Sequence, residues 1–203
     1  MTIAEASMRV VGRACRGVGL VQTAGAEAVP RVGPVILVAN HARRQLDPLL
    51  VALAVPRRLT FVAGEDLRSA WLVRLASRAS SVVFVSAFAP LDVGFVRTCE
   101  RVVREGGALM IFPEGRAMGG GAGLFRRGAA YLALRTGTPL QPVWIERGRL
   151  RTWRILFGRP FQAGHAGVDR RSLDAVTAQL QAAMSALGEG SSPRECRVAG
   201  QPA

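Results

Sequence analysis

The sequence contains no lysine. All 27 basic residues are arginines, against 14 acidic residues, and the formal net charge is +13. Arginine stays protonated at physiological pH, and its planar guanidinium pairs well with phosphate oxygens. This composition favours an anionic partner, such as phospholipid headgroups, a phosphorylated substrate or nucleic acid. Aromatic residues make up only 6% of the chain and no nucleic-acid-reading motif is present, so we expect no nucleic-acid partner.

Cysteine and long apolar runs are also scarce. Cys15, Cys99 and Cys196 are far apart and form no CxxC pair, which argues against a zinc site or a disulfide framework and favours a reducing compartment. A membrane-spanning helix needs about 18 consecutive apolar residues, and no stretch of the sequence reaches that length. The amino terminus lacks a basic segment followed by an apolar core, so we expect no signal peptide. With 49% hydrophobic residues among 203, the chain can still form one domain with a substantial core.

Short apolar segments alternate along the chain with segments of helical periodicity. The segments expected to be buried strands are residues 35–39, 59–63, 82–86, 108–112, 140–145 and 153–157. Apolar residues recur at helical spacing around 71–79, 96–103 and 129–133, and most clearly from Leu173 to Leu187, with Gly188 as a stop. This alternation predicts an α/β sandwich, in which helices flank a mostly parallel central sheet.

The two ends of the chain differ in composition from its middle. In residues 1–25, arginines recur at helical spacing opposite an apolar face; they are Arg9, Arg13 and Arg16. This pattern predicts an amphipathic helix that either lies on anionic lipid or packs on the sheet. Residues 26–188 form the main domain. Residues 189–203 are rich in Ser, Pro and Gly, and we expect a disordered tail there.

Polar residues follow two of the expected strands directly. Asn40 and His41 come after residues 35–39, and Glu114 comes after the segment that ends at Phe112. In open α/β sheets, ligands bind at the edge where the carboxyl ends of the strands emerge. A histidine and a glutamate delivered there by separate strands predict an acid/base and polar-recognition site.

Five short motifs follow one another in a characteristic order. They are Asn40-His41, Leu46-Asp47-Pro48, Phe112-Pro113-Glu114-Gly115-Arg116, Phe125-Arg126-Arg127-Gly128-Ala129 and Pro139-Leu140-Gln141-Pro142-Val143. This order resembles that of the lysophospholipid (1-acylglycerol-3-phosphate) acyltransferase family. The resemblance implies the family's α/β fold, with His41 as general base and Asp47 as the residue that orients it. It also implies that Glu114, Gly115 and Arg116 bind the acceptor, and that acyl-CoA or acyl carrier protein supplies the acyl group, without a metal or cofactor.

Three features depart from the family's pattern. The residues between His41 and Asp47 number five, from Ala42 to Leu46, where the family usually has four, so the loop has to absorb one residue. Gly115 meets Arg116 directly, without the usual intervening threonine. The segment 82–88 lacks the arginine that ends the family's second motif. Any phosphate binding therefore has to use other arginines.

Two of the site residues also fit simpler roles. Asp47 directly before Pro48 is a suitable helix N-cap followed by a proline at the first helical position. Capping and orienting His41 can coexist. Glu114 and Arg116 also fit an ion pair across a turn.

Together these features predict an O-acyltransferase that moves a fatty acyl group from an acyl thioester to the hydroxyl of a lysophospholipid such as 1-acylglycerol 3-phosphate. We expect His41 to take the hydroxyl proton without a covalent acyl-enzyme, because no serine or cysteine accompanies the base. The expected location is cytoplasmic and peripheral, on the anionic inner face of the cell membrane. Two alternatives stay open: another acceptor, either glycerol 3-phosphate or a phosphate-free lysolipid, and a catalytically inactive membrane-binding relative. The sequence does not indicate the oligomeric state.

Overall fold

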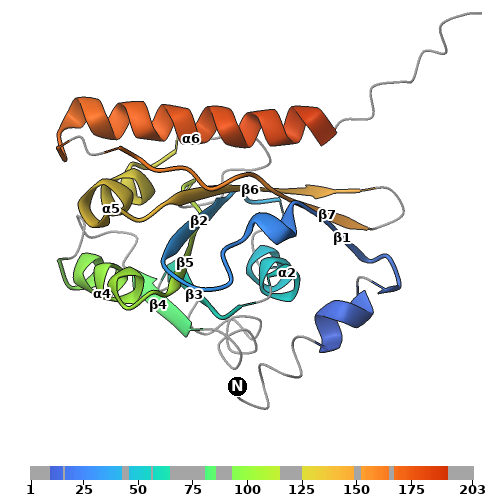
Figure 1. Ribbon diagram of the computed structural model, residues 1–203. Helices are drawn as coiled ribbons and strands as arrows, with labels where there is room; N and C mark the ends of the chain where they lie inside the picture. The colour runs from blue at the N-terminus through green and yellow to red at the C-terminus, as the bar shows by residue number, and fades with distance from the viewer. Residues whose placement is uncertain are drawn as a thin grey trace, which may run out of the picture.

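A seven-stranded sheet forms the centre of the molecule. The computed structural model describes residues 10–15, 17–42, 46–55, 57–64, 81–85, 93–114, 125–148, 152–164 and 167–191. Within these ranges the strands are β1 (Val21–Ala24), β2 (Val35–Ala39), β3 (Leu59–Gly64), β4 (Ser81–Val85), β5 (Ala108–Ile111), β6 (Leu140–Arg147) and β7 (Trp153–Phe157). The helices are η1 (Ala26–Ala28), α2 (Asp47–Ala54), α4 (Val93–Arg104), α5 (Gly128–Thr136) and α6 (Arg170–Ser191). The strand order is β1-β7-β6-β2-β5-β3-β4 (Figure 1).

The predicted α/β architecture is confirmed. Each expected strand is present within two residues of its expected bounds, and α4 and α5 cover the helices expected at 96–103 and 129–133. Neighbouring strands run parallel, except for the antiparallel pair β6 and β7. All five residues of β2 are buried, as expected of a parallel strand that is covered on both faces. The helix expected at 71–79 lies outside the described residues.

The ends of the chain differ from the expectation. Residues 21–24, which we assigned to the amino-terminal helix, form β1 and pair with β7 in parallel; among the described residues before them, 10–15 and 17 are helical. Helix α6 continues to Ser191, so Gly188 does not stop it and residues 189–191 are not part of a disordered tail. Residues 192–203 lie outside the described part of the chain.

Gly188 has a packing role inside α6. A Cβ atom at this position would lie 2.6 Å from Cε2 of Trp144 in β6, which is closer than non-bonded carbon atoms approach. Glycine therefore lets α6 lie directly against the indole ring. The low helix propensity of glycine predicted a stop here, but the contact with Trp144 gives it a different purpose.

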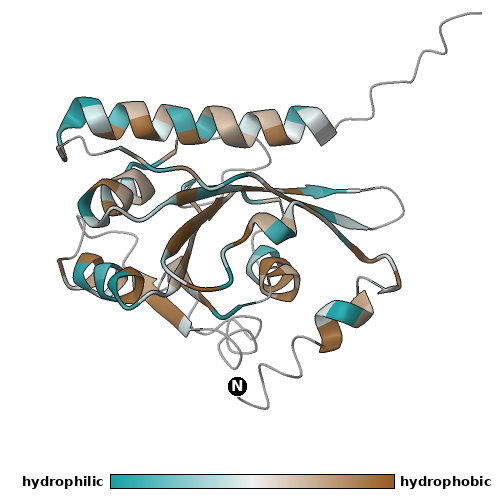
Figure 2. Cartoon of the chain, viewed as in Figure 1, coloured by the Kyte–Doolittle hydropathy of each residue, from teal (hydrophilic) through white to brown (hydrophobic). Residues whose placement is uncertain are grey.

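The helices cover both faces of the sheet. Buried residues of α4, α5 and α6 pack on one face, where they meet Ile36 and Val38 of β2. Helix α2 packs on the opposite face, against Val35 and Leu37. Figure 1 shows α6 and α2 on opposite sides of the sheet, and Figure 2 shows the apolar strands between them. Successive residues of β2 thus reach two separate clusters, which places β2 at the centre of the core.

A glycine-to-alanine pair tests the contact between α6 and the sheet. Gly188→Ala should lower the melting temperature, because overpacking costs about 1–3 kcal/mol and exceeds the about 0.5–1 kcal/mol that alanine contributes in a helix. Gly190→Ala is the matched control, since a Cβ there would meet no atom within 4 Å. It should leave the melting temperature unchanged or raise it. Thermal unfolding followed by circular dichroism measures both, and equal effects of the two substitutions would contradict the packing role.

Candidate active site

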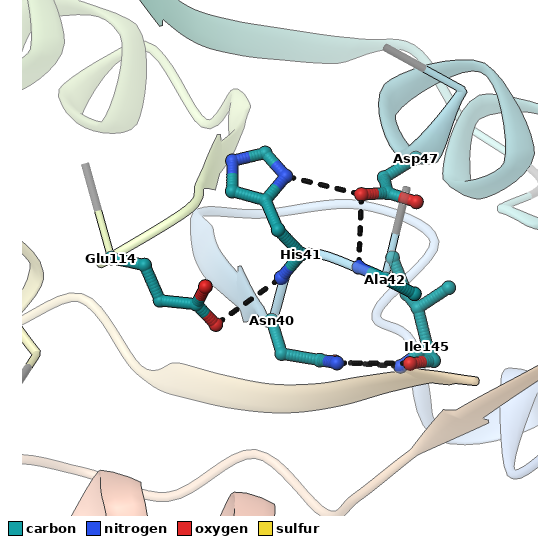
Figure 3. A network of polar contacts seen from close by, with 6 residues as sticks. All are labelled: Asn40, His41, Ala42, Asp47, Glu114 and Ile145. Carbon is teal, nitrogen blue, oxygen red and sulfur yellow. Dashed lines mark hydrogen bonds and ion pairs between the residues drawn. The ribbon is translucent and has the colours of Figure 1, made fainter. Parts of the chain in front are cut away.

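Two neighbouring strands deliver the candidate site to the carboxyl edge of the sheet. β2 and β5 pair in parallel, with Val38 opposite Ile111. Both strands end within one residue of this pair. The segments that follow them therefore leave the sheet side by side, one carrying His41 and the other Glu114. Figure 3 shows these side chains together with Asp47 of α2.

His41 and Asp47 are in direct contact. Nδ1 of His41 lies 3.1 Å from Oδ2 of Asp47, and the same oxygen accepts a hydrogen bond from the backbone N–H of Ala42 at 3.1 Å. The Asp47 side chain is fully buried, and that of His41 is 12% exposed. The spacer of five residues is therefore compatible with the pair, although residues 43–45 lie outside the described part of the chain.

The position of Asp47 in α2 corrects the N-cap prediction. The helix begins at Asp47 itself, and Leu46 occupies the N-cap position without a side-chain hydrogen bond to the helix. The Asp47 carboxylate instead reaches back to the loop that carries His41. Its position in the first turn still places the negative charge at the favourable end of the helix dipole.

The hydrogen bond to Asp47 sets the tautomer of His41. An ionised carboxylate only accepts hydrogen bonds, so Nδ1 of His41 carries the hydrogen and donates it. The other ring nitrogen, Nε2, then holds a lone pair. It points away from Asp47 (Figure 3). An imidazole held in this way can take a proton from a group bound on its Nε2 side.

Phe112 fixes the plane of the imidazole. Its ring lies parallel to that of His41, with the ring centroids 4.3 Å apart and an angle of 10° between the planes. Sequence reasoning placed Phe112 at a strand end but gave it no role. The register of the two strands brings Phe112 to His41. Because Val38 lies opposite Ile111, the residues that follow each strand lie close to one another.

Glu114 contacts the backbone of His41. Its Oε1 accepts a hydrogen bond from the His41 N–H at 3.2 Å. Burial raises the pKa of Glu114 above its ordinary value, and the hydrogen bond from His41 opposes this rise. Gly115 and Arg116, the other members of the expected acceptor-binding element, lie outside the described residues, as does any ion pair between Glu114 and Arg116.

Asn40 joins the end of β2 to β6. Its Nδ2 donates to the carbonyl oxygen of Ile145 at 2.9 Å, and its Oδ1 accepts from the N–H of Ile145 at 2.7 Å. Sequence reasoning named Asn40 beside His41 without this contact. Pro142 and Val143, from the last of the five motifs, lie in β6 opposite Val38 and Ala39 of β2.

Two adjacent arginines before α5 have different surroundings. The backbone N–H of Arg126 donates to the carbonyl oxygen of Pro113 at 2.9 Å, which ties the start of α5 to the residue before Glu114. Arg127 pairs with Asp174 of α6 at 2.5 Å. Arg126 is exposed and has no ion-pair partner among the described residues. The described part of the chain contains no group of three or more His, Cys, Asp or Glu side chains that could hold a metal ion.

The raised pKa of Glu114 predicts a pH-dependent effect of Glu114→Gln. A carboxyl whose pKa is raised by folding destabilises the protein increasingly as pH rises through its ordinary range, and the loss persists at neutral pH. Glutamine keeps an oxygen that can accept from His41 but carries no charge. The melting temperature of the variant minus that of the wild type should therefore be near zero around pH 4 and positive at pH 7.

Thermal unfolding at a series of pH values measures this difference. Glu105→Gln is the control, because Glu105 is exposed and the substitution should give no comparable trend. A pH-independent difference for Glu114→Gln would contradict the burial argument.

Known proteins resemble this chain in sequence and in fold. The profile of the family described as Acyltransferase matches residues 20–146. A 1-acyl-sn-glycerol-3-phosphate acyltransferase from Borreliella burgdorferi is 30% identical over 135 residues, which are 64% of this chain and 52% of that protein. The human 1-acyl-sn-glycerol-3-phosphate acyltransferase alpha is 29% identical over 126 residues, 61% of this chain and 44% of its own. The chain thus spans about half the length of these curated relatives.

The fold also matches a solved structure. A crystal structure of the 1-acyl-sn-glycerophosphate acyltransferase from Thermotoga maritima superposes with a TM-score of 0.66 and 20% sequence identity, covering 92% of this chain and 80% of that one. At this identity the likeness concerns the fold. The family profile, by contrast, covers well over half of the chain and both segments that build the site. On that match, the chain belongs to the acyltransferase family.

Proposed function

We propose that the protein transfers a fatty acyl group from an acyl thioester, acyl-CoA or acyl carrier protein, to the hydroxyl of a lysophospholipid such as 1-acylglycerol 3-phosphate. The observation that carries this proposal is the 3.1 Å contact between Nδ1 of His41 and Oδ2 of Asp47. It leaves Nε2 as a base at the edge of the sheet where ligands bind. No metal or other cofactor takes part in the proposed reaction.

The proposed reaction is a direct transfer. Nε2 of His41 takes the proton of the acceptor hydroxyl while its oxygen attacks the carbonyl carbon of the thioester. The carbon–sulfur bond then breaks, and the departing thiolate takes the proton from the imidazolium. Asp47 stabilises the positive charge that His41 carries between these two events. The contact between His41 and Asp47 favours this enzyme over the alternative of a catalytically inactive relative.

A phosphate-bearing acceptor is favoured by two considerations. Curated relatives are named for 1-acyl-sn-glycerol 3-phosphate. In addition, Arg126 is an exposed cation whose backbone is tied to Pro113, next to Glu114. Arginine suits a phosphate group because its fork of N–H donors matches two oxygens. Together with Arg116, it would replace the arginine that is missing from the second motif. Glycerol 3-phosphate remains the second candidate acceptor.

His41 substitution tests the proposed chemistry. The purified protein should acylate 1-acylglycerol 3-phosphate more efficiently than glycerol 3-phosphate or a monoacylglycerol when given labelled acyl-CoA or acyl carrier protein. His41→Ala should lower kcat/KM by about 10²- to 10⁴-fold, the usual contribution of a general base. His165→Ala, which removes the only other histidine, should leave it unchanged. Full activity in a folded His41→Ala protein would exclude the mechanism.

We further propose that the protein works as a peripheral protein on the anionic inner face of the cell membrane. Residues before β1 expose apolar side chains beside Arg13: Val10 is 66% exposed, Val11 47%, Val18 71% and Leu20 50%. Apolar side chains next to a cation suit an interfacial contact with anionic lipid. None of the helices in the described residues is both long enough and apolar enough to cross a bilayer.

Vesicle binding tests the membrane proposal. The protein should pellet with phosphatidylglycerol vesicles at low salt and be released at high salt, since each basic residue near the surface contributes about 1 kcal/mol and salt screens this attraction. A Val10→Ser/Val11→Ser protein should bind more weakly. Val32→Ser is the matched control, because Val32 is 84% exposed but lies in the loop before β2, away from the amino-terminal helical residues. Equal binding to neutral and anionic vesicles would contradict the proposal.

A further inference from the structure

The sheet has an incomplete pair of strands beside the site. β2 pairs with β6 as far as Ala39, opposite Val143, and β6 continues to Arg147. Ile145 therefore lies beyond the last residue of β2, and it is only 1% exposed. A buried backbone N–H and C=O without partners would destabilise the fold. Something other than the β2 backbone has to satisfy them.

The side chain of Asn40 takes the place of the missing backbone. Its amide accepts from the Ile145 N–H at 2.7 Å and donates to the Ile145 carbonyl at 2.9 Å. A carboxamide offers the same donor and acceptor as a peptide group, so it continues the hydrogen-bonding ladder by one step. Asn40 is 8% exposed. Figure 3 shows its side chain directed at Ile145, away from the His41 ring.

Because the side chain of Asn40 takes the place of a backbone strand, the backbone after Asn40 can leave the sheet. The N–H of His41 donates to Glu114 rather than to a strand, and the N–H of Ala42 donates to Asp47. Residues 40–42 are therefore held from three directions: by β6, by the segment after β5, and by α2. The Asn40 contact is the one that fixes where the chain leaves the sheet.

We propose that Asn40 is a positioning residue for His41. By attaching the end of β2 to β6, it sets the place of the His41 backbone and therefore the direction in which Nε2 points. Asn40 does not touch the reacting atoms in this proposal. Its effect on catalysis rests on the proposed function, whereas its effect on the His41–Asp47 contact does not.

A substitution in Asn40 tests the effect on catalysis. Asn40→Ala should lower kcat by about 10- to 100-fold, because a displacement of about 1 Å in a reacting group is enough for such a loss, and KM for the acceptor should change by less than about twofold. Gln141→Leu is the matched control. It also removes a bond from a side-chain amide of β6 to a backbone carbonyl, from Gln141 to Gly158 at 3.0 Å, but at the other end of the strand. Its kcat should stay at the wild-type value.

A double-mutant cycle separates positioning from general stability. If Asn40 acts through His41, then Asn40→Ala should have no further effect on the residual rate of the His41→Ala protein. A role that is only structural would lower both rates equally. Equal losses in the two backgrounds, or a wild-type kcat in the folded Asn40→Ala protein, would overturn the proposal.

Proton NMR tests the position of His41 without the reaction. The Nδ1 proton that bonds to Asp47 should give a downfield signal in the wild type, absent from His41→Ala. The signal should weaken or shift in Asn40→Ala and persist in Gln141→Leu. If Asn40→Ala fails to fold, Asn40→Asp replaces it, since aspartate keeps the shape and the bond from the Ile145 N–H but cannot donate when ionised. An unchanged signal and kcat in that variant would also overturn the proposal.

The two proposals can fail separately. A wild-type protein that acylates no acceptor would contradict the proposed function, and the NMR comparison would still decide the role of Asn40. An active wild type with an inactive His41→Ala and a fully active Asn40→Ala would contradict the positioning role alone.

Discussion

The buried carboxylate of Asp47 is the constraint on which the site depends. A charge removed from water is costly unless it is paired and hydrogen-bonded. Asp47 is fully buried, and it has His41 and the backbone of Ala42 as donors. The loop therefore has to return to the amino end of α2 for the fold to tolerate this group. The same bonds that satisfy the charge set the tautomer of His41, so the stability of the fold and the chemistry of the site share one contact.

The pairing of β2 with β5 determines where the other residues of the site lie. β2 and β5 are parallel neighbours in a fixed register. This pairing brings His41, Phe112 and Glu114 to the same edge of the sheet. Phe112 restrains the ring of His41, and Glu114 restrains its backbone. Glu114 thus has a positional contact in addition to the acceptor-binding role that the family resemblance implies.

The sequence predicted the structure best for segments in which all residues share the same surroundings. β2 is buried on both faces, so its apolar run predicted both the strand and the polar residues that follow it. Where two physical demands compete, local patterns were insufficient. Gly188 suggested a helix end, but Trp144 requires a small residue within α6. Asp47 suggested an N-cap, but His41 and Ala42 take its carboxylate. β1 was missed because four residues of mixed burial gain their place from pairing with β7, which a local pattern does not contain.

The longer spacer between His41 and Asp47 shows why motif spacing can change without loss of the pair. The entropy of closing a flexible loop grows slowly with length, so a fifth residue added to four costs only about 0.2 kcal/mol. A charge-assisted hydrogen bond contributes about 1.5–3 kcal/mol. Both ends of the loop are also fixed independently of what lies between them, by Asn40 on β6 and by α2. The two anchors therefore keep His41 and Asp47 in contact across a spacer of five residues.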